Sequence, residues 1–321
     1  MINWGMIGCG DVTEVKSGPA FNIPGKSRIY GVFSRTESSA RDYAKRHNVP
    51  RVFTSVSDLI NAPEIDAIYI ATPPATHPDL ALQVAQAKKP CCLEKPIANS
   101  HAEAVQITEA FRIAGVPVFV AYYRRTLPRF EAVRAWISDG KIGSVRHVHW
   151  GLTQQPRKED IAGQYSWRID PALAPGGYFD DLACHGLDLF DHYLGPIIEA
   201  SGNSVNRQNI YNVPDSVSGH WLHEGGITGT GYWNFAADQT EDEVVIIGDK
   251  GRIVFSVFDD TNPRCEIGSE TLTIDVKHPK HVQKFHVEAM VAHLSGGSSY
   301  SSTGQSATRI AWVCDRVLGK L

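Results

Sequence analysis

The sequence has little net charge and no long run of either sign. It carries 31 lysines and arginines against 35 aspartates and glutamates, which gives a formal net charge of −4. Proteins that bind nucleic acid gain much of their affinity by neutralising phosphates with basic side chains, and this chain has no excess of them. We therefore predict that nucleic acid is not a partner.

Long apolar runs are also absent. No segment approaches the roughly 18–20 uninterrupted apolar residues of a membrane-spanning helix. The first residues lead directly into a strand-like segment and leave no room for a signal peptide. These two features predict that the protein has no membrane partner and resides in the cytoplasm.

Cysteine is sparse and scattered. The six cysteines form neither a Cys-x-x-Cys pair nor the close spacing of small secreted domains. Neither a zinc knuckle nor a disulfide framework is expected, and reduced thiols suit a cytoplasmic enzyme. We predict no metal site.

What is present is the composition of an ordinary folded protein. The 321 residues are 42% apolar and 21% charged, which argues against disorder. A chain of this length exceeds one typical hydrophobic core. We predict two domains, residues 1–121 and residues 122–321.

The first domain alternates strands with helices. Such alternation predicts an α/β fold in which parallel strands are joined by right-handed crossovers, as in a Rossmann dinucleotide-binding domain. The expected strands are residues 2–7, 29–33, 51–53, 65–71, 91–93 and 116–121. The expected helices between them are residues 41–47, 57–61, 78–87 and 102–114.

The second domain has a different pattern. After Ser201, segments with a period of two predominate, which is typical of antiparallel strands. We predict an α+β domain with a large, mainly antiparallel sheet. Its expected strands include residues 144–152, 216–223, 227–235, 243–247, 253–257 and 271–276, with helices at residues 129–139 and 305–318.

A glycine-rich turn follows the first strand and reads Gly-x-Gly-x-x-Thr from Gly8 to Thr13. Gly8 would permit the tight turn, and Gly10 would let backbone N–H groups approach a pyrophosphate. Thr13 stands where the dinucleotide fingerprint has its third glycine or alanine. We predict that Gly8, Gly10, Asp11 and Val12 bind the cofactor; a βα turn without a ligand is the alternative.

The second strand ends in Ser34 and Arg35. A site selective for NAD usually carries an Asp or Glu here to bind the ribose 2′-hydroxyl, and this chain has none. A hydroxyl and a guanidinium suit a 2′-phosphate instead. We predict NADP as the preferred cofactor over NAD, although Arg35 could also stack on adenine without contacting a phosphate.

Two further strand ends should meet the cofactor at the same sheet edge, because ligands bind at the carboxyl ends of parallel strands. The first carries Thr72, Pro73 and His77, and the second reads Glu94-Lys95-Pro96, in which a cis Lys–Pro bond would fix the loop. An isolated Glu-Lys-Pro could equally be a solvated turn. We assign Thr72, Pro73, His77, Glu94 and Lys95 to the cofactor site.

A helix of about 16 residues should begin after Gly177 and end before Gly195-Pro196. Asp181, His185, Asp188 and His192 lie at i, i+4, i+7 and i+11 and therefore share one side of it. This stripe could be a solvated face, a metal site, or a substrate site in which Asp181 and His185 bind hydroxyl groups.

Taken together, these motifs resemble the Gfo/Idh/MocA oxidoreductase family, which includes glucose–fructose oxidoreductase and inositol dehydrogenases. The resemblance covers essentially the whole chain, and the departures are Thr13 and Pro74. The motifs that carry it are Gly8-x-Gly10, Thr72-Pro73 with His77, Glu94-Lys95-Pro96, Tyr123-Arg124-Arg125, Trp167-Arg168, Gly176-Gly177 with Asp181-x-x-x-His185, and Ser302-Thr303-Gly304.

The resemblance implies hydride transfer between a nicotinamide and a hydroxyl or carbonyl carbon of a sugar or cyclic polyol. It implies that Lys95 is the acid/base group and that Asp181 and His185 lie beside the reacting hydroxyl. It also suggests a homodimer or homotetramer formed through the C-terminal sheet. The expected substrate contacts, besides these three residues, are Tyr123, Arg124, Tyr165, Trp167 and Arg168.

Two alternatives belong to other functional classes. One is a glycosidase that uses NAD for a transient oxidation on the same fold. The other is a non-catalytic, cofactor-sensing regulator, similar to the galactose repressor of yeast. The joint presence of Lys95, Asp181 and His185 argues against the regulator.

Overall fold

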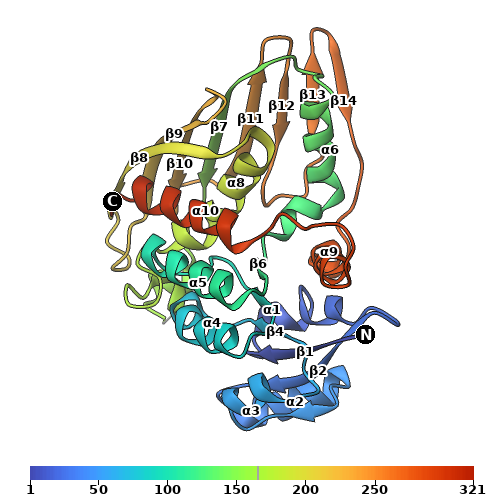
Figure 1. The fold of residues 1–321 in the computed structure, drawn as a ribbon. Coiled ribbons are helices and arrows are strands. Elements are labelled where there is room, and N and C mark those ends of the chain that lie inside the picture. Colours follow the sequence, from blue (N-terminus) through green and yellow to red (C-terminus); the bar gives the residue numbers. More distant parts are fainter. Residues whose placement is uncertain (165) are drawn as a thin grey trace. The chain divides into compact units, whose positions relative to one another are not determined.

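The computed structural model describes residues 1–164 and 166–321 and divides into two compact units (Figure 1). Unit 1 contains residues 1–123 and 279–308, and unit 2 contains residues 124–278 and 309–321. The sequence-based boundary at residues 121 and 122 differs from this division, because it leaves residues 279–308 in the second domain. Tyr165, a predicted substrate contact, lies outside the described residues.

Unit 1 is built on a six-stranded parallel sheet with the order β3-β2-β1-β4-β5-β6. The chain reverses its direction of travel through the sheet between β1 and β4, and this is the position at which open α/β sheets bind ligands. The predicted Rossmann fold is confirmed. The strands are β1 (Ile2–Ile7), β2 (Ser27–Phe33), β3 (Arg51–Val52), β4 (Ala67–Ile70), β5 (Cys91–Leu93) and β6 (Val118–Val120).

The helices of unit 1 carry the start and stop signals expected from sequence. Ser55 and Ser100 accept hydrogen bonds from backbone N–H groups in the first turns of α3 and α5, and Gly115 ends α5 in a left-handed conformation. The helical segments are α1 (Asp11–Glu14), η1 (Gly18–Phe21), α2 (Glu37–His47), α3 (Val56–Asn61), η2 (Pro74–Thr76), α4 (His77–Gln86), α5 (His101–Ala114) and α9 (Lys284–Leu294).

Helix α9 explains why residues 279–308 belong to unit 1. Its side chains Val287, Met290 and Val291 are buried in one hydrophobic cluster with Trp4 and Phe21. This helix was not predicted, because the apolar residues of α9 are spread around the helix and form no single stripe. Its place in the fold depends on packing with residues almost 300 positions earlier in the chain.

Unit 2 is built on an eight-stranded sheet with the order β14-β13-β12-β11-β7-β10-β9-β8. Neighbouring strands are antiparallel except for β7 and β10, so the predicted, mainly antiparallel sheet is confirmed. The strands are β7 (Val145–Thr153), β8 (Ile197–Val205), β9 (Ser216–His223), β10 (Thr228–Asn234), β11 (Glu241–Gly248), β12 (Arg252–Phe255), β13 (Arg264–Ile267) and β14 (Glu270–Thr273).

Helices pack on one face of this sheet (Figure 1). In α8 (Tyr178–Leu194), Phe190 lies against Trp150 and Trp221, with ring centroids 5.9 Å and 5.8 Å away. In α6 (Pro128–Ser138), the ring of Phe130 packs against that of Phe255, with the two ring centroids 6.1 Å apart. The remaining segments are η3 (Tyr123–Thr126), α7 (Lys158–Ile161), η4 (Trp167–Ile169) and α10 (Gly304–Val317). Among the helices of residues 1–164 and 166–321, none combines the length and apolar character that a membrane crossing requires.

Candidate functional site

The turn between β1 and α1 has the backbone that a diphosphate requires. Gly8 has a φ of +103°, and a Cβ atom at this position would lie 2.6 Å from the carbonyl oxygen of Ala71. Gly10 directly precedes α1, and the space beside its Cα is open, with no atom within 4 Å of a Cβ built there. A phosphate could therefore approach the backbone at Gly10, so the turn fits a dinucleotide.

Thr13 is compatible with this turn. Its side chain is fully buried, and its hydroxyl donates to the carbonyl oxygen of Gly10 at 2.7 Å. The close packing that the third fingerprint glycine usually allows occurs instead at Gly18, where a Cβ would lie 2.3 Å from the carbonyl oxygen of Thr13. Helix α1 ends after four residues, and η1 begins at Gly18.

The end of β2 presents Ser34 and Arg35. The backbone N–H of Gly8 donates to the carbonyl oxygen of Phe33 at 2.9 Å, so the glycine-rich turn lies directly beside the end of β2. Ser34 is partly exposed and Arg35 is exposed. Within the described part of the chain, no hydrogen bond or ion pair engages the Arg35 guanidinium, so it remains available to an anionic ligand.

His77 lies between the turns that follow β4 and β5. Its ring is fully buried, with Nε2 2.9 Å from the carbonyl oxygen of Thr72 and Nδ1 3.1 Å and 3.2 Å from those of Pro96 and Ile97. Burial lowers the pKa of His77. The sequence assigns His77 to the cofactor site, but both of its ring nitrogens face backbone carbonyls in the interior. Its side chain therefore supports the two turns.

Lys95 stands out at the end of β5. In the stretch from Cys91 to Ala98 every residue is buried except Lys95, which is partly exposed. The peptide bond between Lys95 and Pro96 is cis, as the sequence suggested. This turn thus directs one charged side chain to the surface from an otherwise buried segment.

Glu94 points into the interior of unit 1. Its side chain is buried, and Oε1 accepts hydrogen bonds from the Tyr69 hydroxyl at 2.6 Å and from Nε2 of Gln283 at 2.7 Å. Tyr69 and Gln283 were not identified from the sequence. Tyr69 is one aromatic residue in a buried strand, and Gln283 comes from a segment assigned to the other domain, so neither carried a local signal.

In unit 2, α8 begins at a pair of glycines. Gly177 has a φ of +61°, and the backbone N–H of Gly176 donates to the Asp180 carboxylate at 2.7 Å. A Cβ at Gly176 would lie 2.4 Å from the same carboxylate, so only glycine leaves room for it. The two glycines therefore set the position at which Asp181 and His185 follow on the helix.

Three predicted substrate residues meet at the first turn of α8. Nε of Arg168 donates to Oδ2 of Asp181 at 2.8 Å, and the Arg168 guanidinium lies over the ring of Trp167 at 4.4 Å. The Arg168 side chain is 35% exposed and that of Asp181 only 11%. The structure brings Trp167, Arg168 and Asp181 into one partly accessible cluster.

His185 contacts a residue that the sequence did not reveal. The ring of Phe258 lies 5.8 Å from that of His185 in an edge-on arrangement, and the Arg124 guanidinium lies over Phe258 at 4.6 Å. Nε of Arg124 also donates to the carbonyl oxygen of Val257 at 2.9 Å. Arg124 is therefore buried against the loop after β12. Phe258 is an aromatic residue in an irregular loop, where no periodicity marks it.

Asp188 and His192, the two C-terminal members of the α8 stripe, have structural roles. Asp188 accepts two hydrogen bonds from Arg125, at 2.6 Å and 2.7 Å, and both side chains are almost fully buried. Burial raises the pKa of Asp188 to about 6, because desolvation outweighs the attraction of Arg125. Burial likewise lowers the pKa of His192 to about 4. Among the described residues, no group of three or more His, Cys, Asp or Glu side chains could hold a metal ion.

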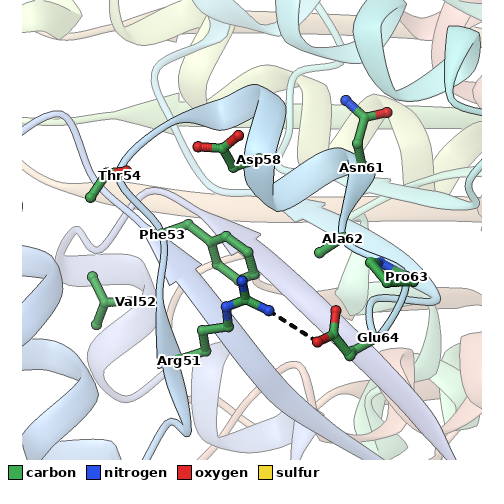
Figure 2. A pocket seen from close by; sticks show the side chains of 9 residues that line it. All are labelled: Arg51, Val52, Phe53, Thr54, Asp58, Asn61, Ala62, Pro63 and Glu64. Carbon is green, nitrogen blue, oxygen red and sulfur yellow. Dashed lines mark hydrogen bonds and ion pairs between the residues drawn. The ribbon is translucent and has the colours of Figure 1, made fainter.

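A surface pocket of about 450 Å³ lies beside β3 and α3 (Figure 2). Its lining contains none of the predicted site residues. Arg51 pairs with Glu64 at 3.0 Å and lies over Phe53 at 4.4 Å, so the arginine of the pocket already has partners in the pocket lining. The predicted residues gather elsewhere: the cofactor candidates at the carboxyl edge of the unit 1 sheet, and the substrate candidates around the first half of α8 in unit 2. Tyr123, partly exposed in η3, is the last residue of the first of the two segments that form unit 1.

Two family models match the chain. The first, described as "Oxidoreductase family, NAD-binding Rossmann fold", matches residues 2–122. The second, the "GFO/IDH/MocA C-terminal domain", matches residues 130–254. Together they cover most of the sequence and both of its halves.

Several known proteins are similar over most of their length. Oxidoreductase P35 of Formosa agariphila is 34% identical over 319 residues, covering 99% of this chain and 98% of the relative. The 1,5-anhydro-D-fructose reductase of Ensifer adhaerens is 24% identical, covering 79% of this chain and 75% of the relative. The trans-1,2-dihydrobenzene-1,2-diol dehydrogenase of Bos taurus is 26% identical, covering 78% of this chain and 72% of the relative.

Solved structures share the fold. A levoglucosan dehydrogenase in complex with NADH and levoglucosan superposes with a TM-score of 0.85 at 20% identity, covering 98% of this chain and 96% of that one. An aldose–aldose oxidoreductase from Caulobacter crescentus, complexed with glycerol, has a TM-score of 0.86 at 19% identity, covering 98% and 96%. The family models, the 34% identical relative and the shared two-unit architecture lead to one conclusion: the chain belongs to the GFO/IDH/MocA family of oxidoreductases.

Proposed function

We propose that this oxidoreductase uses NADP in preference to NAD and transfers a hydride to or from a hydroxyl or carbonyl carbon of a sugar or cyclic polyol. The substrate class is supported by the names of similar proteins, which include a 1,5-anhydro-D-fructose reductase and a levoglucosan dehydrogenase. The cofactor class is supported by the NAD-binding family model and by the open backbone at Gly10.

The exposure of Lys95 carries the catalytic proposal. A bound nicotinamide supplies the carbon that gives or accepts the hydride. Lys95 moves the accompanying proton: its ammonium donates to the substrate oxygen during reduction, and its amine accepts from the hydroxyl during oxidation. As the one partly exposed residue between Cys91 and Ala98, Lys95 is the group in this turn that a substrate can reach.

Asp181, His185 and Trp167 bind and orient the substrate in this proposal. The Arg168 side chain restrains the Asp181 carboxylate, which can then accept hydrogen bonds from substrate hydroxyls in a fixed direction. His185, held against Phe258, can hold a hydroxyl or pass a proton. Trp167 supplies an apolar ring face of the kind that packs against carbohydrates.

Substitution of Lys95 tests the proposal directly. We expect Lys95→Ala to lower kcat by about 100-fold or more, the scale of acid–base catalysis, and to leave cofactor binding intact. Nicotinamide absorbance would follow turnover on a panel of sugars and polyols, and fluorescence titration would give the cofactor Kd. Lys45→Ala, on an exposed surface of α2, is the matched control. Near-normal turnover by Lys95→Ala would overturn the role of Lys95.

The same panel separates the alternative functions. Release of an alcohol from a glycoside without net change in nicotinamide absorbance would indicate the redox-assisted glycosidase. Cofactor binding without turnover on any member of the panel would favour the regulator.

A double-mutant cycle tests whether Lys95 and His185 serve the same substrate. Groups that act as a unit in one chemical step lose activity non-additively. We expect the double variant with Lys95→Ala and His185→Ala to lower kcat by a much smaller factor than the product of the two single-variant reductions. If the double variant lowers kcat by the full product of the two single-variant reductions, the two residues act separately.

Arg35 is the basis of the NADP preference. It carries no protein partner within the described residues and follows β2, where the ribose 2′ position is read in this fold. A charge-assisted hydrogen bond contributes roughly 1.5–3 kcal/mol, so we expect Arg35→Ala to weaken NADP binding by about 10-fold or more. NAD binding should change little. Equal losses for both cofactors would overturn the preference.

A further inference from the structure

We propose that Gln283 is a positioning residue that acts through Glu94 to hold Lys95 in place. The inference rests on the proposed catalytic role of Lys95. It also gives the segment after the second sheet a part in the reaction chemistry of unit 1.

Glu94 is a buried carboxylate held in the interior by hydrogen bonds. The Tyr69 hydroxyl and the Gln283 amide both donate to its Oε1, at 2.6 Å and 2.7 Å. A buried carboxylate is costly unless donors surround it, so these two hydrogen bonds determine where the Glu94 side chain can rest. Since Glu94 and Lys95 are adjacent, the placement of Glu94 limits the placement of Lys95.

Tyr69 remains a donor across the working pH range. Burial raises the pKa of Tyr69 well above its usual value, and the charge of Glu94 raises it further. Tyr69 belongs to β4, which pairs with β5, so this contact comes from within the sheet. Gln283 instead brings a second donor from the distant C-terminal segment.

The Gln283 side chain is oriented for this one contact. A carboxylate oxygen accepts hydrogen bonds, so the amide must present its NH₂ group to Glu94. That orientation leaves Oε1 of Gln283 buried and, among the described residues, without a hydrogen-bond partner. The Gln283 backbone is fixed as well, because its N–H donates to the carbonyl oxygen of Lys16 at 3.1 Å and the residue directly precedes α9.

The other flank of Lys95 is fixed independently. His77 lies within 3.2 Å of the carbonyl oxygens of Pro96 and Ile97, on the C-terminal side of Lys95. On the N-terminal side, the backbone N–H of Glu94 donates to the carbonyl oxygen of Ile70. Lys95 therefore lies between two anchored neighbours. Within the described residues, loss of the Gln283 contact would leave the Glu94 carboxylate with one side-chain donor, Tyr69, and would let the Glu94 side chain shift beside Lys95.

Two substitutions at Gln283 separate hydrogen bonding from packing. Gln283→Leu removes the donor, and we expect kcat to fall by about 10-fold, because small displacements of a catalytic group are expensive. Gln283→Glu keeps the size but places two carboxylates together, and such a pair takes up a shared proton as the pH falls. Its kcat relative to wild type should therefore rise toward one at lower pH, whereas that of Gln283→Leu should stay low.

Val287→Ala is the packing control, since the Val287 side chain is fully buried in the hydrophobic cluster in the next turn of α9 and the substitution leaves the backbone unchanged. It should lower the thermal midpoint without changing the pH dependence of kcat. If Gln283→Leu and Gln283→Glu behave like Val287→Ala, with no pH-dependent recovery, the residue is only structural and the inference is overturned.

NMR tests the positioning of Lys95 independently of turnover. With carbon-labelled lysine and the Lys95 signal assigned through Lys95→Arg, we expect the signal to move in Gln283→Leu and not in Val287→Ala. An unmoved Lys95 signal would overturn the inference. A moved signal together with normal turnover by Lys95→Ala would instead overturn the proposed catalytic role and support the positioning itself.

Discussion

Individual acidic residues of α8 differ in function because they differ in their arginine partners. Asp188 is buried with Arg125, and Asp191 accepts two hydrogen bonds from Arg309 at 2.6 Å and 2.7 Å. Asp181 instead meets Arg168 where both side chains retain some exposure. The same residue type is therefore buried with an arginine at Asp188 and Asp191 and keeps some exposure two to three turns earlier, at Asp181.

The Arg125–Asp188 pair gives a stability prediction. Arg125→Leu would leave the Asp188 carboxylate buried and uncompensated, which typically costs about 3–5 kcal/mol. Urea unfolding of the variant and the wild type measures the difference. The control is Arg146→Leu, whose pair with Asp249 is exposed and should contribute less than about 1 kcal/mol. If both variants lose the same small amount of unfolding free energy, the structural role of Arg125 is contradicted.

His192 gives a prediction about pH. Burial, with Arg125 and Arg134 nearby, lowers its pKa to about 4, although Asp191 opposes the shift. A histidine with a lowered folded pKa contributes stability above its unfolded value of about 6.5, and that stability is lost as the pH falls toward 4. At pH 4 the loss reaches about 3 kcal/mol, since each pKa unit corresponds to about 1.4 kcal/mol.

Thermal unfolding between pH 7.5 and pH 4 checks this expectation. His192→Gln cannot take up a proton, so it should lose less stability on acidification than the wild type does. Parallel losses in the two proteins would mean that His192 does not contribute to acid sensitivity.

Among the secondary-structure elements, the β1–α1 turn depends on one backbone conformation. Gly8→Ala would add a Cβ against the Ala71 carbonyl at a positive φ, so the turn must shift. We expect the cofactor affinity, measured by fluorescence titration, to fall by about 10-fold or more. This is the effect of losing one hydrogen bond between the backbone and a charged phosphate. Gly115→Ala shares the positive φ but meets no atom within 4 Å. It should reduce stability and leave the cofactor Kd unchanged; the same Kd in both variants would contradict the proposed cofactor turn.

Most elements could be predicted from local patterns. The apolar strands β1 and β9 have the predicted bounds, and α5 begins one residue earlier than expected because Ser100 caps it. The strands β8 and β13 and the helix α9 were not predicted. Exposed residues interrupt the apolar pattern of β8, and the apolar residues of α9 follow no single stripe, so neither element carries a clear period.

For the whole molecule, the two faces of the unit 2 sheet differ in what covers them. Helices cover the face with Trp150 and Trp221, whereas the opposite face carries His147, whose ring nitrogens lie 2.8 Å and 3.0 Å from Thr228 and Thr230 hydroxyls. Ile247 pairs with His147 across β11 and β7 and is 41% exposed. We propose that this face joins copies of the chain into a homodimer or homotetramer.

Ile247→Glu tests this assembly. A charge at a buried, self-complementary interface should dissociate the oligomer, and multi-angle light scattering would report the change in mass. Ile161→Glu is the control, because Ile161 is also exposed but lies in α7. A monomeric wild type, or an oligomer unaffected by Ile247→Glu, would overturn the proposal.

The sequence by itself determined the two kinds of sheet and the glycine-rich turn, because these depend on local spacing and on residue type. It could not reveal that Gln283 reaches Glu94, that Arg125 neutralises Asp188, or that Phe258 contacts His185. Each of these contacts joins residues far apart in the chain, and no local period records such a pair. Packing therefore decided which members of the α8 stripe are buried with an arginine and which side chains surround Glu94.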